Sequence, residues 1–469
     1  MLTHDATNEM HPILDKLSTV RFEERWSQPE IIKVRQFGGK AVPLLRRVLR
    51  EKDKPTTRFL LWVKGKWPGV TKFYPHIPDE NKLTERRATA CQVLQMLGPA
   101  GKSAATELIM IMASKDAGDV NAASMALWAT GIDPDACEQI DEVLEKGTSG
   151  FGRSQLILAL ASVKPPSART LSALRTSLAD PLPYIPNYAA ETLGRLGVGT
   201  PDVISGLKRL LNSSTNELTV VTASTALWDL EKDSGSVSGR VLQLLSNQLQ
   251  APIKLPLGGG SGGQGVDATE QIFMKAAELF QKMKMNETEK SNALALLQSF
   301  CEKSGRIFVR MLLLPAMLDL GYPQQKCLEV CDTGLQQEEI YYRLQAAQLL
   351  VGVSDRFQGQ GIDPEPLIRD QNVGVRVYAC QIHWRKNKRA NDVIPILTEA
   401  LDRNKHQSYY YAEILPAALN TLGEIGTAAA VAEQNIAALT NDPNPSIAKL
   451  ANETLAKIHK PTRFEFPVR

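Results

Sequence analysis

A short apolar pattern recurs through this chain of 469 residues with a period close to 33 residues. In the first half it places five leucines at equivalent positions, 33, 31, 35 and 34 residues apart: Leu94, Leu127, Leu158, Leu193 and Leu227. It returns later at steps of 33, 40 and 33 residues, with Leu349, Ile382, Leu422 and Leu455. Such a period is typical of arrays in which each repeat buries its apolar face against the next. The chain therefore need not contain the roughly three globular domains that its length suggests.

Each repeat predicts two helices joined by a turn. The first helix places small residues one turn before large ones, as in Ala189-Ala190 followed by Leu193. A turn with glycine follows, as at Gly98-Pro99, and then a second apolar helix, as in residues 200–211. Aromatic residues make up only 6% of the chain, which suits Leu/Ala helix packing better than a β-sandwich core. We therefore predict an all-α protein, an α-α superhelix of ten or more helix pairs.

The turns and helices resemble those of HEAT repeats. Residues 367–376 (LIRDQNVGVR) and the following Tyr378-Ala379-Cys380 match the Asp-rich turn, the Val-Arg step and the Ala/Leu helix of that family. Residues 440–455 match too, with Ile447-Ala448 in place of Val-Arg. The chain thus resembles the HEAT-repeat α-solenoids, a family that shades into armadillo and bilin-lyase-like HEAT proteins. The resemblance implies a HEAT-like solenoid whose inner face comes from the helices carrying Trp128, Trp228 and His383. It implies no activity, because such arrays serve many functions.

Composition divides the chain into five segments. They are a basic N-terminal cap with a first atypical repeat (1–83), a HEAT-like array (84–257), a Gly-rich linker or loop (258–267), an irregular helical segment (268–336), and a second HEAT-like array with a C-terminal tail (337–469). The tract Gly258–Gly265 formally contains GxGxxG and GxSxG, but both motifs need a strand, a tight turn and a helix around them. We interpret the tract as a flexible connection, either between two stacked arrays or within one, and favour the first.

Charge is distributed unevenly. Residues 33–87 contain fifteen Lys/Arg against five Asp/Glu, whereas the whole chain has a net charge of only +3. Within them, cations alternate with aromatic residues that could stack on bases while the cations neutralise phosphates. The candidate binding residues are Arg58, Trp62, Lys64, Lys66, Trp67, Lys72 and Tyr74. The structural alternative is a capping hairpin over the first repeat, with partly buried aromatic side chains.

Other chemistry-bearing residues indicate structural roles. The six cysteines contain no CxxC pair, and most lie in apolar helical runs, so we expect buried, reduced thiols. Trp128 and Trp228 occupy equivalent places in their repeats, which favours packing between repeats over a binding groove. His383 is expected on a helix surface. No residue pattern indicates a catalytic site, a metal site or a cofactor.

The sequence therefore favours a non-enzymatic α-solenoid scaffold that binds a protein partner along its curved surface. A nucleic-acid-binding HEAT protein that uses the basic aromatic segment is an alternative, and a HEAT-type lyase is a second. The same segment could also bind an anionic membrane surface. No signal peptide is visible, so a cytoplasmic protein is expected unless the chain is a trimmed mature form of an exported one. The oligomeric state is left open.

Overall fold

Every element that the structure describes is helical, so the predicted all-α class is confirmed. The computed structural model describes residues 12–20, 30, 33–34, 37–51, 59, 63, 66–67, 81–114, 119–146, 150–232, 237–250, 267–358, 361–402, 411–442 and 445–459. The chain divides into two compact units, Met1–Lys232 and Asp233–Arg469, called unit 1 and unit 2 below. The Gly-rich tract lies outside the described residues, and the five predicted segments stay a prediction.

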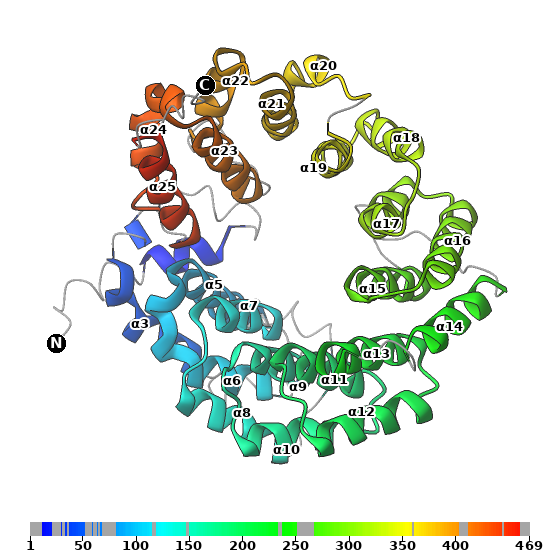
Figure 1. Cartoon of the computed structure of the whole chain (residues 1–469). Helices are drawn as coiled ribbons and strands as arrows, with labels where there is room; N and C mark the ends of the chain where they lie inside the picture. The colour runs from blue at the N-terminus through cyan, green and yellow to red at the C-terminus, as the bar shows by residue number, and fades with distance from the viewer. Residues whose placement is uncertain are drawn as a thin grey trace, which may run out of the picture. The chain divides into compact units, whose positions relative to one another are not determined.

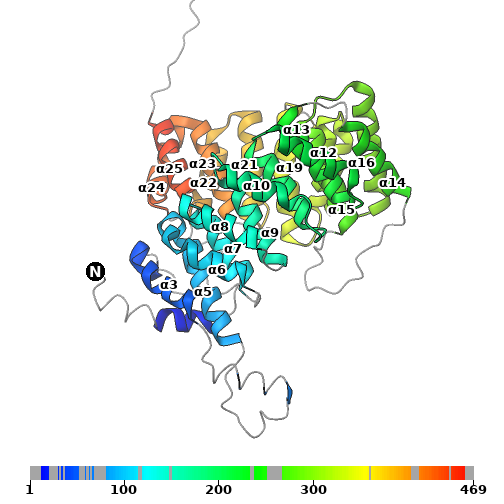
Figure 2. The ribbon, with the colours of Figure 1, turned by 90° about the horizontal axis from the view of Figure 1, so that it is seen from below.

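Unit 1 is a stack of helices in two rows (Figure 1). The first row consists of α5 (Asn81–Leu97), α7 (Val120–Thr130), α9 (Gly150–Ala159), α11 (Ile185–Leu196) and α13 (Glu217–Glu231). The second consists of α3 (Val42–Arg50), α6 (Ala105–Ala113), α8 (Pro134–Lys146), α10 (Ala168–Ser177) and α12 (Pro201–Ser213). The 3₁₀ helix η2 (Gly38–Ala41) directly precedes α3, whereas η4 (Gly98–Ala104) and η5 (Leu160–Ser162) connect α5 to α6 and α9 to α10. The first row lies on the concave side of the unit, and Figure 2, seen from below, brings α8, α10 and α12 of the second row forward.

Unit 2 repeats the arrangement. Its first row consists of α15 (Ala268–Lys282), α17 (Ile307–Asp319), α19 (Ile340–Arg356), α21 (Val373–Asn387), α23 (Tyr411–Ile425) and α25 (Pro445–Ile458). The remaining helices are α14 (Ser238–Gln250), α16 (Glu287–Ser304), α18 (Gln324–Leu335), α20 (Glu365–Ile368), α22 (Ala390–Ala400), η6 (Gly426–Ala432) and α24 (Glu433–Ala438). Residues 268–336, where the repeat pattern is hard to recognise, form α15–α18, and α15, α17 and α19 pack in succession.

The recurring apolar positions all lie on first-row helices. Six of the nine are buried: Leu94, Leu127, Leu193, Leu227, Ile382 and Leu422. The other three are partly buried, and two of these, Leu349 and Leu455, pack against the cores of unit 2. The period read from the sequence is thus the spacing at which first-row helices bury their apolar side.

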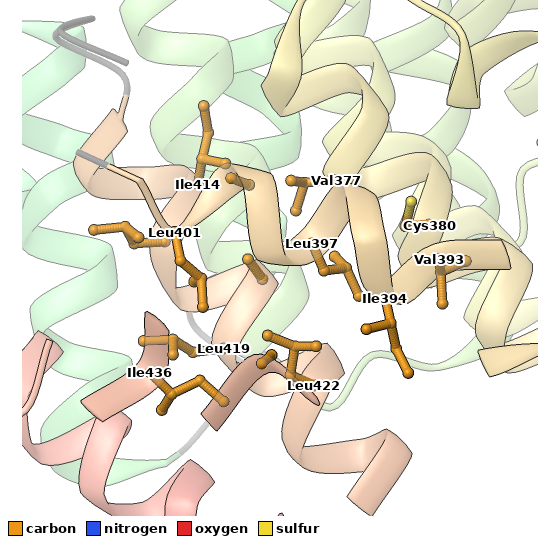
Figure 3. Packing of buried hydrophobic residues seen from close by; sticks show 14 of the residues in the cluster. Val377, Cys380, Val393, Ile394, Leu397, Leu401, Ile414, Leu419, Leu422 and Ile436 are labelled. Carbon is orange, nitrogen blue, oxygen red and sulfur yellow. The ribbon is translucent and has the colours of Figure 1, made fainter. Parts of the chain in front are cut away.

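Apolar side chains from consecutive helices form the core of unit 2. Figure 3 shows Val377 of α21, Leu397 of α22 and Leu422 of α23 turned toward one another.

The stretch Ile414–Ala438 is long and apolar enough to cross a membrane by composition alone, with a mean hydropathy of 1.3. Its apolar character has a simpler cause in this fold, because side chains such as Leu415 and Leu419 are fully buried in this core.

In two turns of unit 2, including the HEAT-like turn at residues 367–376, an arginine one turn into the next helix holds the preceding turn. Arg376 Nη1 donates to the carbonyl oxygens of Asp370 at 3.0 Å and Gln371 at 3.2 Å. Arg343, 33 residues earlier, makes the same kind of bond to the carbonyl of Glu338 at 2.8 Å. Residues of the turn lie outside the backbone hydrogen bonds of the helix, so their carbonyl groups need another donor, which the guanidinium supplies. The Val-Arg step of the motif therefore fixes how the chain enters the first-row helix.

Small residues let neighbouring helices approach closely. A Cβ on Gly152 of α9 would overlap the carbonyl oxygen of Met112, at the end of α6. One on Gly194 of α11 would lie 2.9 Å from the Cα of Ala226 in α13. Backbone atoms cannot move aside as the end of a flexible side chain can, so these contacts require glycine.

We expect Gly152→Ala to lower the free energy of unfolding of unit 1 by about 1–3 kcal/mol, because the added methyl group forces α9 away from α6. Urea denaturation followed by circular dichroism measures this. Gly352→Ala is the matched control, since Gly352 lies inside α19 and a Cβ there meets nothing within 4 Å. The control should be neutral or stabilising by up to about 1 kcal/mol. Equal changes in the free energy of unfolding for the two substitutions would contradict the close approach of α9 to α6.

A buried carboxylate attaches α3 to α6. The Glu107 side chain is only 1% exposed and accepts two hydrogen bonds of 3.0 Å from Arg46, and it also pairs with Arg50. Burial by itself would raise the pKa of Glu107, but the bonds from the two arginines outweigh it and hold that pKa below its ordinary value of 4.5. The ionised carboxylate therefore stabilises the folded state.

We expect Glu107→Gln to lower the free energy of unfolding by about 1–2 kcal/mol at pH 7. Because the folded-state pKa is lowered, the wild-type contribution is complete above pH 4.5 and is lost as the pH falls through the folded-state value. The difference between wild type and variant should therefore shrink on acidification. Glu142→Gln is the control, since Glu142 is exposed and pairs with Lys146 four residues on. Its effect should stay below about 0.5 kcal/mol. A difference that is constant with pH would contradict this role.

Candidate binding surface

The structure describes only two of the seven candidate residues in the basic segment, Lys66 and Trp67. Arg58, Trp62, Lys64, Lys72 and Tyr74 lie outside the described residues. Lys66 is exposed, and the side chain of Trp67 is 62% exposed. The binding role of this segment therefore stays a prediction.

Several other cations of residues 33–87 are engaged inside the protein. Besides Arg46 and Arg50, Arg86 contacts Glu51 at 3.2 Å, and Arg87 contacts the buried Asp119 at 2.6 Å. These four arginines attach the N-terminal helices to the first repeats. Part of the local positive charge is thus neutralised by structural ion pairs, as a capping segment would require.

The two equivalent tryptophans differ in the structure. Trp228 is 5% exposed, so the packing role predicted for it is confirmed, and Lys232 Nζ lies 5.7 Å from its ring centre. The same prediction is wrong for Trp128, which is 55% exposed on α7. Beside Trp128 the neighbouring helices present smaller groups, Leu158 and Ala161, and leave a groove of about 300 Å³ instead of a closed contact.

Further large apolar side chains are exposed in the same row as Trp128. They lie on or directly before three successive first-row helices, α7, α9 and α11, and are Met125, Phe151, Leu182 and Tyr184. With Trp128 we call them the Trp128 surface. Met125 lies one turn from Trp128 on the same side of α7. Among the described residues of unit 2, the exposed large apolar side chains are Ile340 and Val431, on separate helices.

Charged groups are sparse in the groove beside Trp128. Arg195 of α11 is its one charged lining residue, and its guanidinium donates to Glu191 at 2.6 Å. A groove with an aromatic wall and a neutralised cation suits an apolar side chain of another molecule. Large exposed apolar patches of this kind mark interaction surfaces in folded proteins.

The expectation that His383 lies on a helix surface is wrong. Its side chain is 1% exposed, because α20 and α22 cover this part of α21. Nδ1 lies 3.2 Å from Glu365 of α20, and Nε2 lies 3.3 Å from Asp392 of α22. The sequence does not show this contact, since the partners come from both neighbouring elements. His383 thus joins three helices of unit 2.

All six cysteines are buried and free, as expected. Burial raises the pKa of the thiols, to about 12 for Cys301 and about 11 for Cys327, which keeps them protonated and poorly nucleophilic at neutral pH. In the part of the chain that the structure describes, no group of three or more His, Cys, Asp or Glu residues could hold a metal ion.

No protein-family model and no curated protein matches the sequence. Among solved structures, the chain is similar to yeast importin-beta (Kap95p), with 13% identity over 97% of this chain and 69% of that one and a TM-score of 0.51. It also aligns with a Kap95:Nup1 complex (14% identity, 93% and 61% covered, TM-score 0.48) and the S. pombe condensin Cnd3–Cnd2 subcomplex (13% identity, 95% and 76% covered, TM-score 0.35). At such identities the likeness concerns the fold. The stacked helix pairs, the repeat period and this likeness together establish that the chain has the HEAT-type α-solenoid fold.

Proposed function

We propose that the chain is a non-enzymatic solenoid scaffold that binds a protein partner through the Trp128 surface. The observation that carries the proposal is the exposure of Met125 and Trp128 on α7, Phe151 on α9, and Leu182 and Tyr184 directly before α11, all in one row. In a solenoid, stacked helices present side chains along a continuous surface, so one partner can contact several repeats at once.

The chemistry of this surface favours a protein over other partners. Aromatic residues and methionine are enriched at the centres of protein interfaces, where charged residues are depleted. Trp128 forms one wall of a groove that can accept an apolar side chain, and the cation of the groove is already paired with Glu191. Tryptophan is enriched among interface hot spots, which cluster in well-packed pockets.

Nucleic-acid binding by the basic segment is the alternative, and one observation favours it: Lys66 and Trp67 are adjacent, and both are exposed. Binding of an anionic membrane surface by the same residues rests on the same observation. Both remain predictions. A phosphate-binding role would make the affinity for DNA fall steeply with salt, whereas contacts of the Trp128 surface would be nearly independent of salt.

The test is affinity capture from the native cells with the full chain as bait, followed by mass spectrometry. We expect a protein that the wild type retains and that Met125→Ala/Trp128→Ala loses by about tenfold or more, because truncating a central aromatic anchor costs about 2 kcal/mol or more of binding. The identified partner is then titrated against both chains to obtain Kd.

Met110→Ala is the matched control. Met110 is a similarly exposed methionine, but it lies on α6, in the second row. It should retain the partner as the wild type does. Equal losses for both variants, or a wild-type bait that retains only salt-sensitive nucleic acid, would refute the proposed function.

A further inference from the structure

A second cavity lies next to the groove at Trp128. It has a volume of about 590 Å³ and lies at the turns that join α7 to α8 and α9 to α10. Ile132 and Ser162 line both the groove and this cavity, so the two are neighbours. Pro134, Val163 and Pro165 supply apolar walls. The cavity is large enough for a side chain or a small molecule.

A buried carboxylate in the wall of this cavity has unused hydrogen-bonding capacity. Asp141 of α8 lines the cavity and is only 1% exposed. Its Oδ2 accepts a hydrogen bond of 2.8 Å from Thr170 Oγ1 and one of 3.5 Å from Ser167 Oγ. Its Oδ1 has no hydrogen-bond partner among the residues that the structure describes. Buried polar atoms are nearly always paired, so an orphaned carboxylate oxygen at a cavity points to a donor from outside the chain.

The groups around Asp141 are already satisfied by one another. Ser167 caps the N-terminus of α10 by accepting the backbone N–H of Thr170 at 3.0 Å, and Cys137 Sγ lies 3.5 Å from Thr170 Oγ1. None of these side chains is bonded to Oδ1. Burial raises the pKa of Asp141, and the hydrogen bond from Thr170 opposes this only in part. The carboxylate is thus held in place, but its hydrogen bonds only partly offset the cost of burying its charge.

The charges of the cavity favour a cation. Arg169 lies in its wall, but its guanidinium donates to both oxygens of Glu145, at 2.8 and 2.7 Å, and to Glu138 at 3.4 Å. Its positive charge is therefore balanced by Glu145. The remaining charged lining residues are three carboxylates, Asp133, Glu138 and Asp141, against one lysine, Lys164. A positively charged donor would relieve this excess.

We propose that this cavity binds a primary ammonium group on an apolar stem, with the ammonium donating to Asp141 Oδ1 and the stem lying against Val163 and Pro165. The same chemistry is offered by a lysine side chain of a bound peptide and by a free alkylamine. The site does not depend on the proposed function, because an isolated amine would occupy it in the same way. If the source is a peptide lysine, the neighbouring Trp128 groove takes an apolar residue of the same peptide.

Saturation-transfer NMR on the full chain tests the site with three probes: Nα-acetyl-lysine methylamide, its Nε-acetylated form and n-butylammonium. We expect saturation at the ε-methylene of the lysine probe and none for the Nε-acetylated form, which lacks the charge. Tighter binding of the lysine probe than of butylammonium assigns the site to a peptide lysine, and the reverse order assigns it to free amines. Absence of transfer to both cationic probes, or equal transfer to the acetylated one, overturns the proposal.

Variants test whether the saturation transfer depends on Asp141. Asp141→Asn should abolish transfer, and the control Asp135→Asn should leave it unchanged, since Asp135 is an exposed carboxylate on the same helix outside the cavity wall. Glu138→Gln is a second test that spares the buried network, because Glu138 is exposed at the edge of the cavity. This substitution should weaken binding of the lysine probe about threefold. Unchanged binding in both Asp141→Asn and Glu138→Gln would show that the amine binds elsewhere.

Discussion

The distance at which neighbouring helices can pack is the constraint on which this structure depends. At Gly152 and Gly194 a helix lies so close to the backbone of another that no side chain fits between them. Close contact buries the recurring leucines, and the leucines must then return at the length of one helix pair, which produces the period of about 33 residues. The rows, the turns and the exposed positions on each helix all follow from that spacing.

The candidate surface is a consequence of the same packing. Because α7, α9 and α11 are held side by side by their buried faces, the residues left over on the concave side of the unit keep fixed positions relative to one another. Trp128 and Met125 are exposed on α7 and bury little within the chain. A preformed apolar surface binds without the entropic cost of ordering a loop. Rigid stacking is thus the property by which the proposed partner would be recognised.

The sequence predicted the helix pairs, the fold and the buried leucines, because each depends on local periodicity. The repeat pattern was harder to recognise in the sequence where aromatic residues replace leucine. In α15, for example, Phe273 stacks on Phe300 with ring centres 3.8 Å apart. It could not distinguish Trp128 from Trp228, since exposure depends on the size of residues in the next repeat. The surroundings of His383 and Asp141 were likewise hidden, because their partners lie on neighbouring helices. The apolar pattern of the sequence specifies which residues face the core. Contacts between helices determine which of the other side chains are exposed and which partners they have.

The arginine in the turn also bears on how such a chain can change over generations. Arg343 and Arg376 each fix the entrance of a helix through carbonyl groups that lie five or six residues before them in the chain. A stretch of DNA that encodes one repeat therefore also encodes the joint to the repeat before it. Duplicating or deleting that stretch would lengthen or shorten the array while every remaining joint keeps its own support.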